Sequence, residues 1–147
     1  MAVIPGTSGD DVQTGTATDD RIIASPGVDV IDGLEGLDTL DYRAAPAGII
    51  LAPEDVGALP EFRTLIFDGF GTFDRVIGGA EGIFGWRFRD VLDGGVLDNQ
   101  FFGFSGDDVP RAGGGSDRLE GGRGNATLDG QEGADTLLGG SGRRGQC

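Results

Sequence analysis

Aspartate recurs in this sequence at a spacing of nine residues. The residues in this register are Asp11, Asp20, Asp29, Asp38, Asp90, Asn99, Asp108, Asp117 and Asp135. Carboxylates are hard oxygen ligands, and calcium takes about six to eight such oxygens in proteins. Carboxylates stacked without a counter-ion would repel one another at low local dielectric. The spacing therefore predicts a series of cation sites. The alternative is that each aspartate only caps backbone amides of its own turn.

Glycine and apolar residues occupy fixed positions of the same nine-residue unit. Four units span residues 6–41 and seven span residues 85–147. Glycine is frequent at the first, second and fourth positions, where it allows a tight turn with its carbonyl oxygens inward. Positions seven to nine then form a short strand with its middle side chain in the core. These core positions hold Gln13, Ile22, Ile31, Leu40, Leu92, Phe101, Pro110, Leu119, Leu128, Leu137 and Gln146.

The units resemble the RTX (repeats-in-toxin) nonapeptide G-G-x-G-x-D-x-U-x, a calcium-binding repeat of β-helices. The closest matches are GLEGLDTLD (33–41), AGGGSDRLE (112–120) and GQEGADTLL (130–138). The resemblance implies an all-β fold, a right-handed parallel β-roll in which two nonapeptides form one coil. It also implies that every second repeat stacks on the same side and shares a calcium ion.

This pairing rule predicts which aspartates face each other across a calcium site. Four intact pairs follow: Asp11 with Asp29, Asp20 with Asp38, Asp90 with Asp108, and Asp117 with Asp135. Asn99 with Asp117 keeps one carboxylate and one amide oxygen. Asp108 with Ala126 loses one ligand, and Ala126 with Arg144 loses both. Weak or empty sites are therefore expected at these last positions.

The middle of the chain breaks the motif. We expect an N-terminal RTX block at residues 1–41, a calcium-poor spacer at 42–84 that continues the solenoid, and a C-terminal RTX block at 85–147 that degenerates at its end. Within the spacer, Asp74 falls at position six of a unit at 69–77, and Ile49 and Phe67 fall at position eight. All nine Phe residues and Trp86 lie between residues 62 and 104. They either thicken the core or form an exposed patch for a partner.

Composition and charge exclude several classes of function. The 25 acidic residues exceed the 11 basic ones, which argues against binding to nucleic acid or to anionic membranes. No apolar run is long enough for membrane insertion. Histidine is absent and Cys147 is the only cysteine, so neither imidazole-based catalysis nor an internal disulfide is expected. The sequence therefore predicts a protein that is not an enzyme and whose only cofactor is calcium. A carboxylate-only glycan-processing site at Asp41, Glu54, Asp55 and Glu61 is a remote alternative.

Low apolar content and crowded carboxylates predict a chain that folds only when calcium binds. The RTX resemblance implies a bacterial protein that is secreted by the type I route and functions outside the cell. An alternative is an adhesion or self-assembly module that pairs through the ends or faces of the solenoid, or through the Phe-rich segment.

Overall fold

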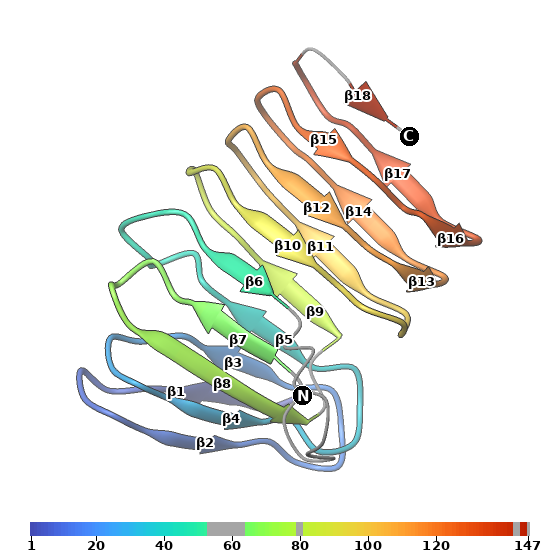
Figure 1. Cartoon of the computed structure of the whole chain (residues 1–147). Coiled ribbons are helices and arrows are strands. Elements are labelled where there is room, and N and C mark those ends of the chain that lie inside the picture. The colour runs from blue at the N-terminus through green and yellow to red at the C-terminus, as the bar shows by residue number, and fades with distance from the viewer. Residues whose placement is uncertain (53–63, 79–80, 143–144, 147) are drawn as a thin grey trace.

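A computed structural model describes residues 1–52, 64–78, 81–142 and 145–146. The described residues form strands and turns without a helix, so no described helix is long and apolar enough to cross a membrane. Two sheets face each other, and the chain alternates between them as it climbs the stack (Figure 1). The predicted all-β solenoid of parallel strands is confirmed.

The first sheet, sheet A, is parallel throughout. Its strands, in spatial order, are β1 (Val3–Pro5), β3 (Arg21–Ile23), β5 (Thr39–Asp41), β9 (Gly82–Phe84), β11 (Gln100–Phe102), β14 (Arg118–Glu120) and β17 (Thr136–Leu138). Most neighbours are 18 residues apart, as in the pairing of Val3 with Arg21. One coil therefore contains two nonapeptides, as the resemblance implies.

The second sheet, sheet B, faces sheet A. Its strands, in spatial order, are β2 (Val12–Thr14), β4 (Val30–Asp32), β8 (Phe73–Gly78), β7 (Thr64–Phe67), β6 (Ile50–Ala52), β10 (Val91–Asp93) and β12 (Val109–Arg111). A bridge between Arg111 and Asp129 continues it toward β15 (Thr127–Leu128), which pairs with β18 (Gly145–Gln146). Strands β13 (Gly114–Gly115) and β16 (Glu132–Gly133) form a small pair at a turn.

The middle segment enters sheet B as an antiparallel meander. Strand β7 pairs antiparallel with both β6 and β8, while β8 joins β4 and β6 joins β10 in parallel. Sheet A steps directly from β5 to β9 over the same interval, with Thr39 opposite Gly82. Sheet B thus has two strands more than sheet A here, or about 10 Å at the usual strand spacing. The stack changes direction at this insertion (Figure 1).

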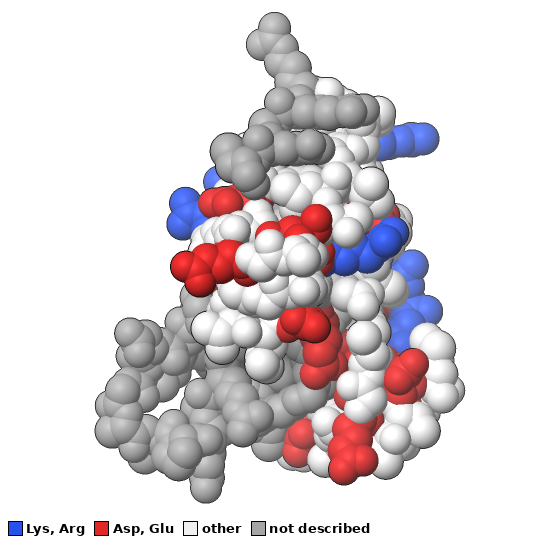
Figure 2. Space-filling view, turned by 90° about the vertical axis from the view of Figure 1, so that its right-hand side faces the viewer, with Lys and Arg blue, Asp and Glu red and all other residues white. Residues whose placement is uncertain are grey.

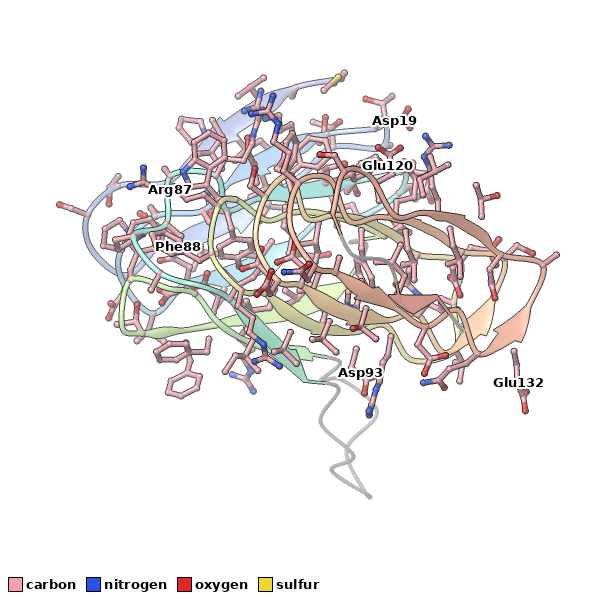
Figure 3. All side chains as sticks on the ribbon, turned by 90° about the horizontal axis from the view of Figure 1, so that it is seen from above. Asp19, Arg87, Phe88, Asp93, Glu120 and Glu132 are labelled. Carbon is pink, nitrogen blue, oxygen red and sulfur yellow. The ribbon has the colours of Figure 1, made fainter. Side chains whose placement is uncertain are left out.

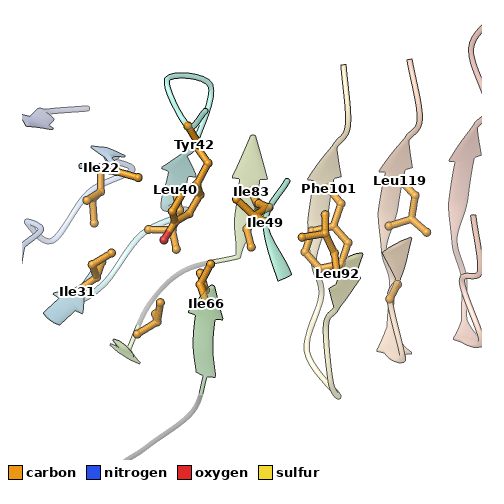
Figure 4. Packing of buried hydrophobic residues seen from close by; sticks show 14 of the residues in the cluster. Ile22, Ile31, Leu40, Tyr42, Ile49, Ile66, Ile83, Leu92, Phe101 and Leu119 are labelled. Atoms are coloured by element: carbon orange, nitrogen blue, oxygen red, sulfur yellow. The ribbon is translucent and has the colours of Figure 1, made fainter. Parts of the chain in front are cut away.

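A single file of apolar side chains fills the space between the sheets (Figure 4). In most of the three-residue strands whose side chains are described, the middle side chain is buried, as the burial of Ile22, Ile31 and Leu119 illustrates. The predicted position-eight core is confirmed for the described side chains, although Leu137 is only partly buried and Gln13 contributes a buried amide. Gln146 lies among residues whose side chains are not described. Short strands can build this core because each unit adds one layer to its neighbours.

The middle segment departs from the expected nonapeptide register. Ile49 is buried, but it directly precedes β6 and so takes the place of position six. Of the two described side chains of β7, Ile66 is fully buried and Phe67 is not, and the antiparallel pairing sets Ile66 opposite Leu51. Phe67 instead contacts the exposed Phe73 edge-on. Tyr42 is fully buried beside this meander and helps to fill the wider interior.

Candidate metal centre

The predicted aspartate pairs lie on neighbouring coils and are joined by hydrogen bonds. In each case the backbone N–H of the first residue donates to Oδ1 of the residue 18 positions later. The donor–acceptor distances are 2.9 Å for Asp11 to Asp29, 2.8 Å for Asp20 to Asp38, 3.0 Å for Asp90 to Asp108, 2.7 Å for Asn99 to Asp117 and 3.1 Å for Asp117 to Asp135. The structure therefore brings together all four predicted pairs and the Asn99 pair.

Two ladders result, one at each edge of the solenoid. The ladder that precedes the strands of sheet A contains Asp20, Asp38, Glu81, Asn99, Asp117 and Asp135. The ladder that precedes the strands of sheet B contains Asp11, Asp29, Asp74, Ile49, Asp90 and Asp108. Ile49 interrupts the second ladder because β6 brings no acid to this position. Glu81 keeps the first ladder acidic across the middle segment.

Some of these aspartates are closed onto their own turn. The backbone N–H of Thr7 donates to Asp11 Oδ2 at 2.6 Å, and that of Thr16 donates to Asp20 Oδ2 at 2.6 Å. The Trp86 N–H reaches Asp90 at 3.3 Å. Each donor is at position two of its unit and is outside the left-handed region of φ. These carboxylates make the turn-capping contacts considered above as the alternative to metal binding.

Other turns are open, because position two adopts a left-handed conformation. Its φ is 71° at Leu34, 60° at Phe104 and 100° at Gly113. The N–H of Leu34 then bonds Asp32 and not the position-six carboxylate. In these three turns Oδ2 of Asp38, Asp108 and Asp117 is buried and has no hydrogen-bond partner. A buried carboxylate oxygen without a partner is costly, so each open turn is suited to an ion.

Gly103, at position one of its unit, allows the Asp108 carboxylate to approach the backbone closely. A Cβ at Gly103 would lie 2.2 Å from Oδ2 of Asp108, closer than van der Waals contact allows. Glycine therefore lets the Asp108 carboxylate lie against the start of its turn, as Gly85 does for Asp90, whereas Ala112 holds this position in the turn of Asp117. The orphaned carboxylate oxygens of the open turns fit a hard cation.

Asn99 closes its turn in a different way. Its Nδ2 donates to the carbonyl oxygen of Gly94 at 3.3 Å and also to that of Leu97. The amide group thus satisfies carbonyls that would otherwise be available to a cation, in keeping with the weak site expected here.

Burial sets the ionisation of the ladder. Burial raises the pKa of Asp38 and Asp117, and it raises the pKa of Asp108 to about 7. The main hydrogen bond acting against burial in each case is the one across the coils. The pKa of Asp20 is instead lowered, first by the hydrogen bond from the Ala2 N–H and then by those from Thr16. Burial also raises the pKa of Asp90, whose turn is closed, so the direction of the shift follows burial and not the class of turn.

A further row of acids lies at position five, which the spacing argument did not single out. Asp10, Asp19, Asp98 and Asp107 accept hydrogen bonds from backbone N–H groups 18 residues later. The doubled acids in the sequence, such as Asp107 and Asp108, were the available signal. Separate groups of acidic side chains lie over the middle and lower part of one face, with arginines at its margins (Figure 2). Seen from above, Asp93 and Glu132 point away from the sheets (Figure 3).

The four acids considered for glycan processing do not form a described site. Asp41 is buried between Arg43, at 2.7 Å, and Arg21, both of which pair with it. Burial opposes its charged form, but the hydrogen bonds from the arginines outweigh burial and lower its pKa. Glu54, Asp55 and Glu61 lie outside the described residues. A cavity of about 290 Å³ adjoins the Asp41 cluster and is lined in part by Trp86.

These features define the class of protein: a β-solenoid with paired carboxylates at the turns of successive coils. The model of the RTX calcium-binding nonapeptide repeat matches the chain in four copies, at residues 5–40 and 111–144. The chain thus contains RTX calcium-binding nonapeptide repeats, which indicate a calcium-binding β-roll module. No curated protein matches it.

The described side chains also indicate how calcium would be held. No group of three or more acidic, histidine or cysteine side chains converges in the described part of the chain. Each pair of turns brings two position-six side chains, so most of the oxygens must come from backbone carbonyls of the glycine-rich turns. Such a donor set fits calcium, which prefers oxygen ligands and tolerates irregular geometry.

Proposed function

We propose that calcium binding at the open turns drives folding of this β-roll. The observation that carries the proposal is the unpartnered, buried Oδ2 of Asp38, Asp108 and Asp117. A calcium ion would supply the missing partner and relieve repulsion along each ladder. The predicted ligand residues are Asp11, Asp20, Asp29, Asp38, Asp90, Asp108, Asp117 and Asp135, with Asn99 as a weak one, and the open-turn members supply the strongest sites.

The energy of calcium binding would then contribute to folding. The core has one apolar layer per unit, and the chain carries a formal charge of −14, so the metal-free fold has little to offset chain entropy. Sites built largely from backbone oxygens bind calcium at about 10⁻⁴–10⁻³ M, a range typical of extracellular modules. RTX repeats are typical of secreted bacterial proteins, and we propose a secreted, extracellular location for this chain.

Calcium titration tests the proposal directly. Circular dichroism and small-angle scattering of the full chain should show an expanded state in chelator and a compact β-rich state at millimolar calcium. Magnesium at the same ionic strength is the control for screening. A chain that is equally compact in chelator and in calcium would overturn the proposal.

A further inference from the structure

Glu81 takes the place of a position-six aspartate, although it belongs to no nonapeptide unit. It directly precedes β9, as Asp38 precedes β5 and Asn99 precedes β11. The backbone N–H of Asp38 donates to Oε2 of Glu81 at 3.0 Å. The same contact joins Asp20 to Asp38 and Asn99 to Asp117. Glu81 therefore forms the rung that the regular pattern assigns to an aspartate 18 residues away, here from 43 residues along the chain.

Asp38 presents a free oxygen at this rung. Its Oδ1 accepts the Asp20 N–H from the preceding coil, while its Oδ2 is buried without a partner. Asp38 itself is fully buried. Among the acids that repel the Asp38 carboxylate, Glu81 has the largest effect, ahead of Asp20. The orphaned oxygen thus belongs to an open turn that has a second carboxylate on the next coil.

We propose that a calcium ion binds between Asp38 and Glu81 and joins the N-terminal and C-terminal blocks of the solenoid. Carbonyl oxygens of the open turn at residues 33–38 supply further ligands. The inference rests on the proposed calcium-dependent folding, and adds a site that the nonapeptide pattern does not contain. Strand β9 is where sheet A crosses the middle segment, so this ion ties β5 to β9 directly.

Within the part of the chain that the structure describes, the opposite edge of the solenoid has no acidic pair at the corresponding position. At the opposite edge, Ile49 replaces the acid and donates its N–H to Asp90 Oδ1 at 2.9 Å. That edge therefore has no acidic pair where β6 meets β10. The Asp38–Glu81 rung is the acidic connection across the insertion among the described residues, and calcium-induced order passes from one block to the other through it.

The test compares Glu81→Gln with Glu132→Gln in the full chain. The amide introduced by Glu81→Gln keeps an oxygen that can accept the Asp38 N–H, so the rung can form while one charge is lost. Glu132 is exposed in β16, and Glu132→Gln gives the same charge change away from the site. Bound calcium is counted by equilibrium dialysis, and folding is followed by circular dichroism during calcium titration.

We expect Glu81→Gln to bind one ion fewer than the wild type and to fold in two separate calcium-dependent steps, while Glu132→Gln behaves as the wild type. An unchanged ion count and a single transition in Glu81→Gln would overturn the inference while the proposed function stands. A wild-type chain that binds no calcium would overturn both. If Glu81→Gln fails to fold at any calcium level, Asp38→Asn is measured in its place with the same expected loss, and an unchanged ion count there likewise overturns the inference.

Discussion

Closed and open turns use the same aspartate for different purposes. In the first two units, Thr7 and Thr16 donate backbone N–H groups to the position-six carboxylate, and the turn is satisfied without a metal. In the units of Asp108 and Asp117, position two has a positive φ, and a buried carboxylate oxygen is left without a partner. The conformation of one residue at position two thus decides whether the aspartate caps its turn or is left open to a cation.

The comparison shows that an intact motif aspartate is not sufficient to mark a strong site. Both interpretations of the repeat, metal binding and turn capping, find support in different turns of one chain. The two classes are also unevenly distributed. The first two turns are closed. Among the described turns from Gly103 onward, those of Asp108 and Asp117 have orphaned carboxylate oxygens. Variants can therefore separate the two roles within a single molecule.

The largest expected effect is on the pH dependence of folding without calcium, because a proton on Asp108 can neutralise the carboxylate as calcium would. An acid with a folded-state pKa of about 7 and an ordinary unfolded value near 3.8 favours folding when it is protonated. This contribution is complete below the unfolded pKa and is lost as pH rises through about 7. A tenfold change in proton affinity is worth about 1.4 kcal/mol, so the effect is of the order of 4 kcal/mol.

In chelator the wild-type chain should therefore be expanded at pH 8 and become compact toward pH 5, as measured by scattering and circular dichroism. Asp108→Asn should be more compact than the wild type at pH 8 and show a weaker pH response. Equal pH profiles for the two proteins would show that Asp108 does not control the transition.

The next effect separates the open turn from the closed one. In Asp117→Asn, the amide keeps an oxygen for the Asn99 N–H and places its NH₂ at the orphaned position. We expect little change in the chelator-treated protein and an increase of about tenfold in the calcium concentration at the folding midpoint, worth about 1.4 kcal/mol.

Asp20→Asn is the matched change in a closed turn. Its NH₂ would face the Thr16 N–H, which now donates to Oδ2 at 2.6 Å. Loss of this cap should cost about 1–2 kcal/mol at saturating calcium, as measured by urea unfolding, with a smaller change in calcium affinity than in Asp117→Asn. If both variants change calcium affinity equally, the distinction between the two turns is wrong.

The smallest effect concerns the strain that keeps a turn open. Leu34 holds φ at 71°, a conformation that glycine adopts without a steric penalty. Leu34→Gly should stabilise the calcium-bound protein by about 1 kcal/mol in urea unfolding, because the penalty is removed. Leu37→Gly, at another exposed leucine of the same turn, should destabilise it or leave it unchanged. Stabilisation of both variants to the same degree would point to a cause other than the φ of Leu34.

The nine-residue repeat predicted most of the core and ladder positions of the solenoid, because the same residue types recur at the same positions of each unit. Position eight marks the core residues from Ile22 to Leu128, and position six marks the residues that pair across coils. Asp74 also lies in the ladder, as its place in the unit at 69–77 suggested. These assignments need only the spacing, since each short strand repeats its neighbour.

The missed features depend on contacts that no local pattern contains. The antiparallel pairing of β7 moved the buried position from Phe67 to Ile66, because strand direction and register are set by the partner strands. Glu81 has no motif around it and is identified only by its contact with Asp38. The open turns at Leu34 and Phe104 also lack glycine at position two, so their positive φ carried no signal in the sequence.

The two additional strands of sheet B bend the solenoid, and the amino-acid sequence determines where this bend lies. Sheet A keeps a constant step between strands while sheet B is lengthened, so the folded solenoid bends at the insertion. Bound calcium would make this bend more rigid, but the difference in strand number between the two sheets determines the bend itself. The two arms of the roll therefore point in different directions (Figure 1).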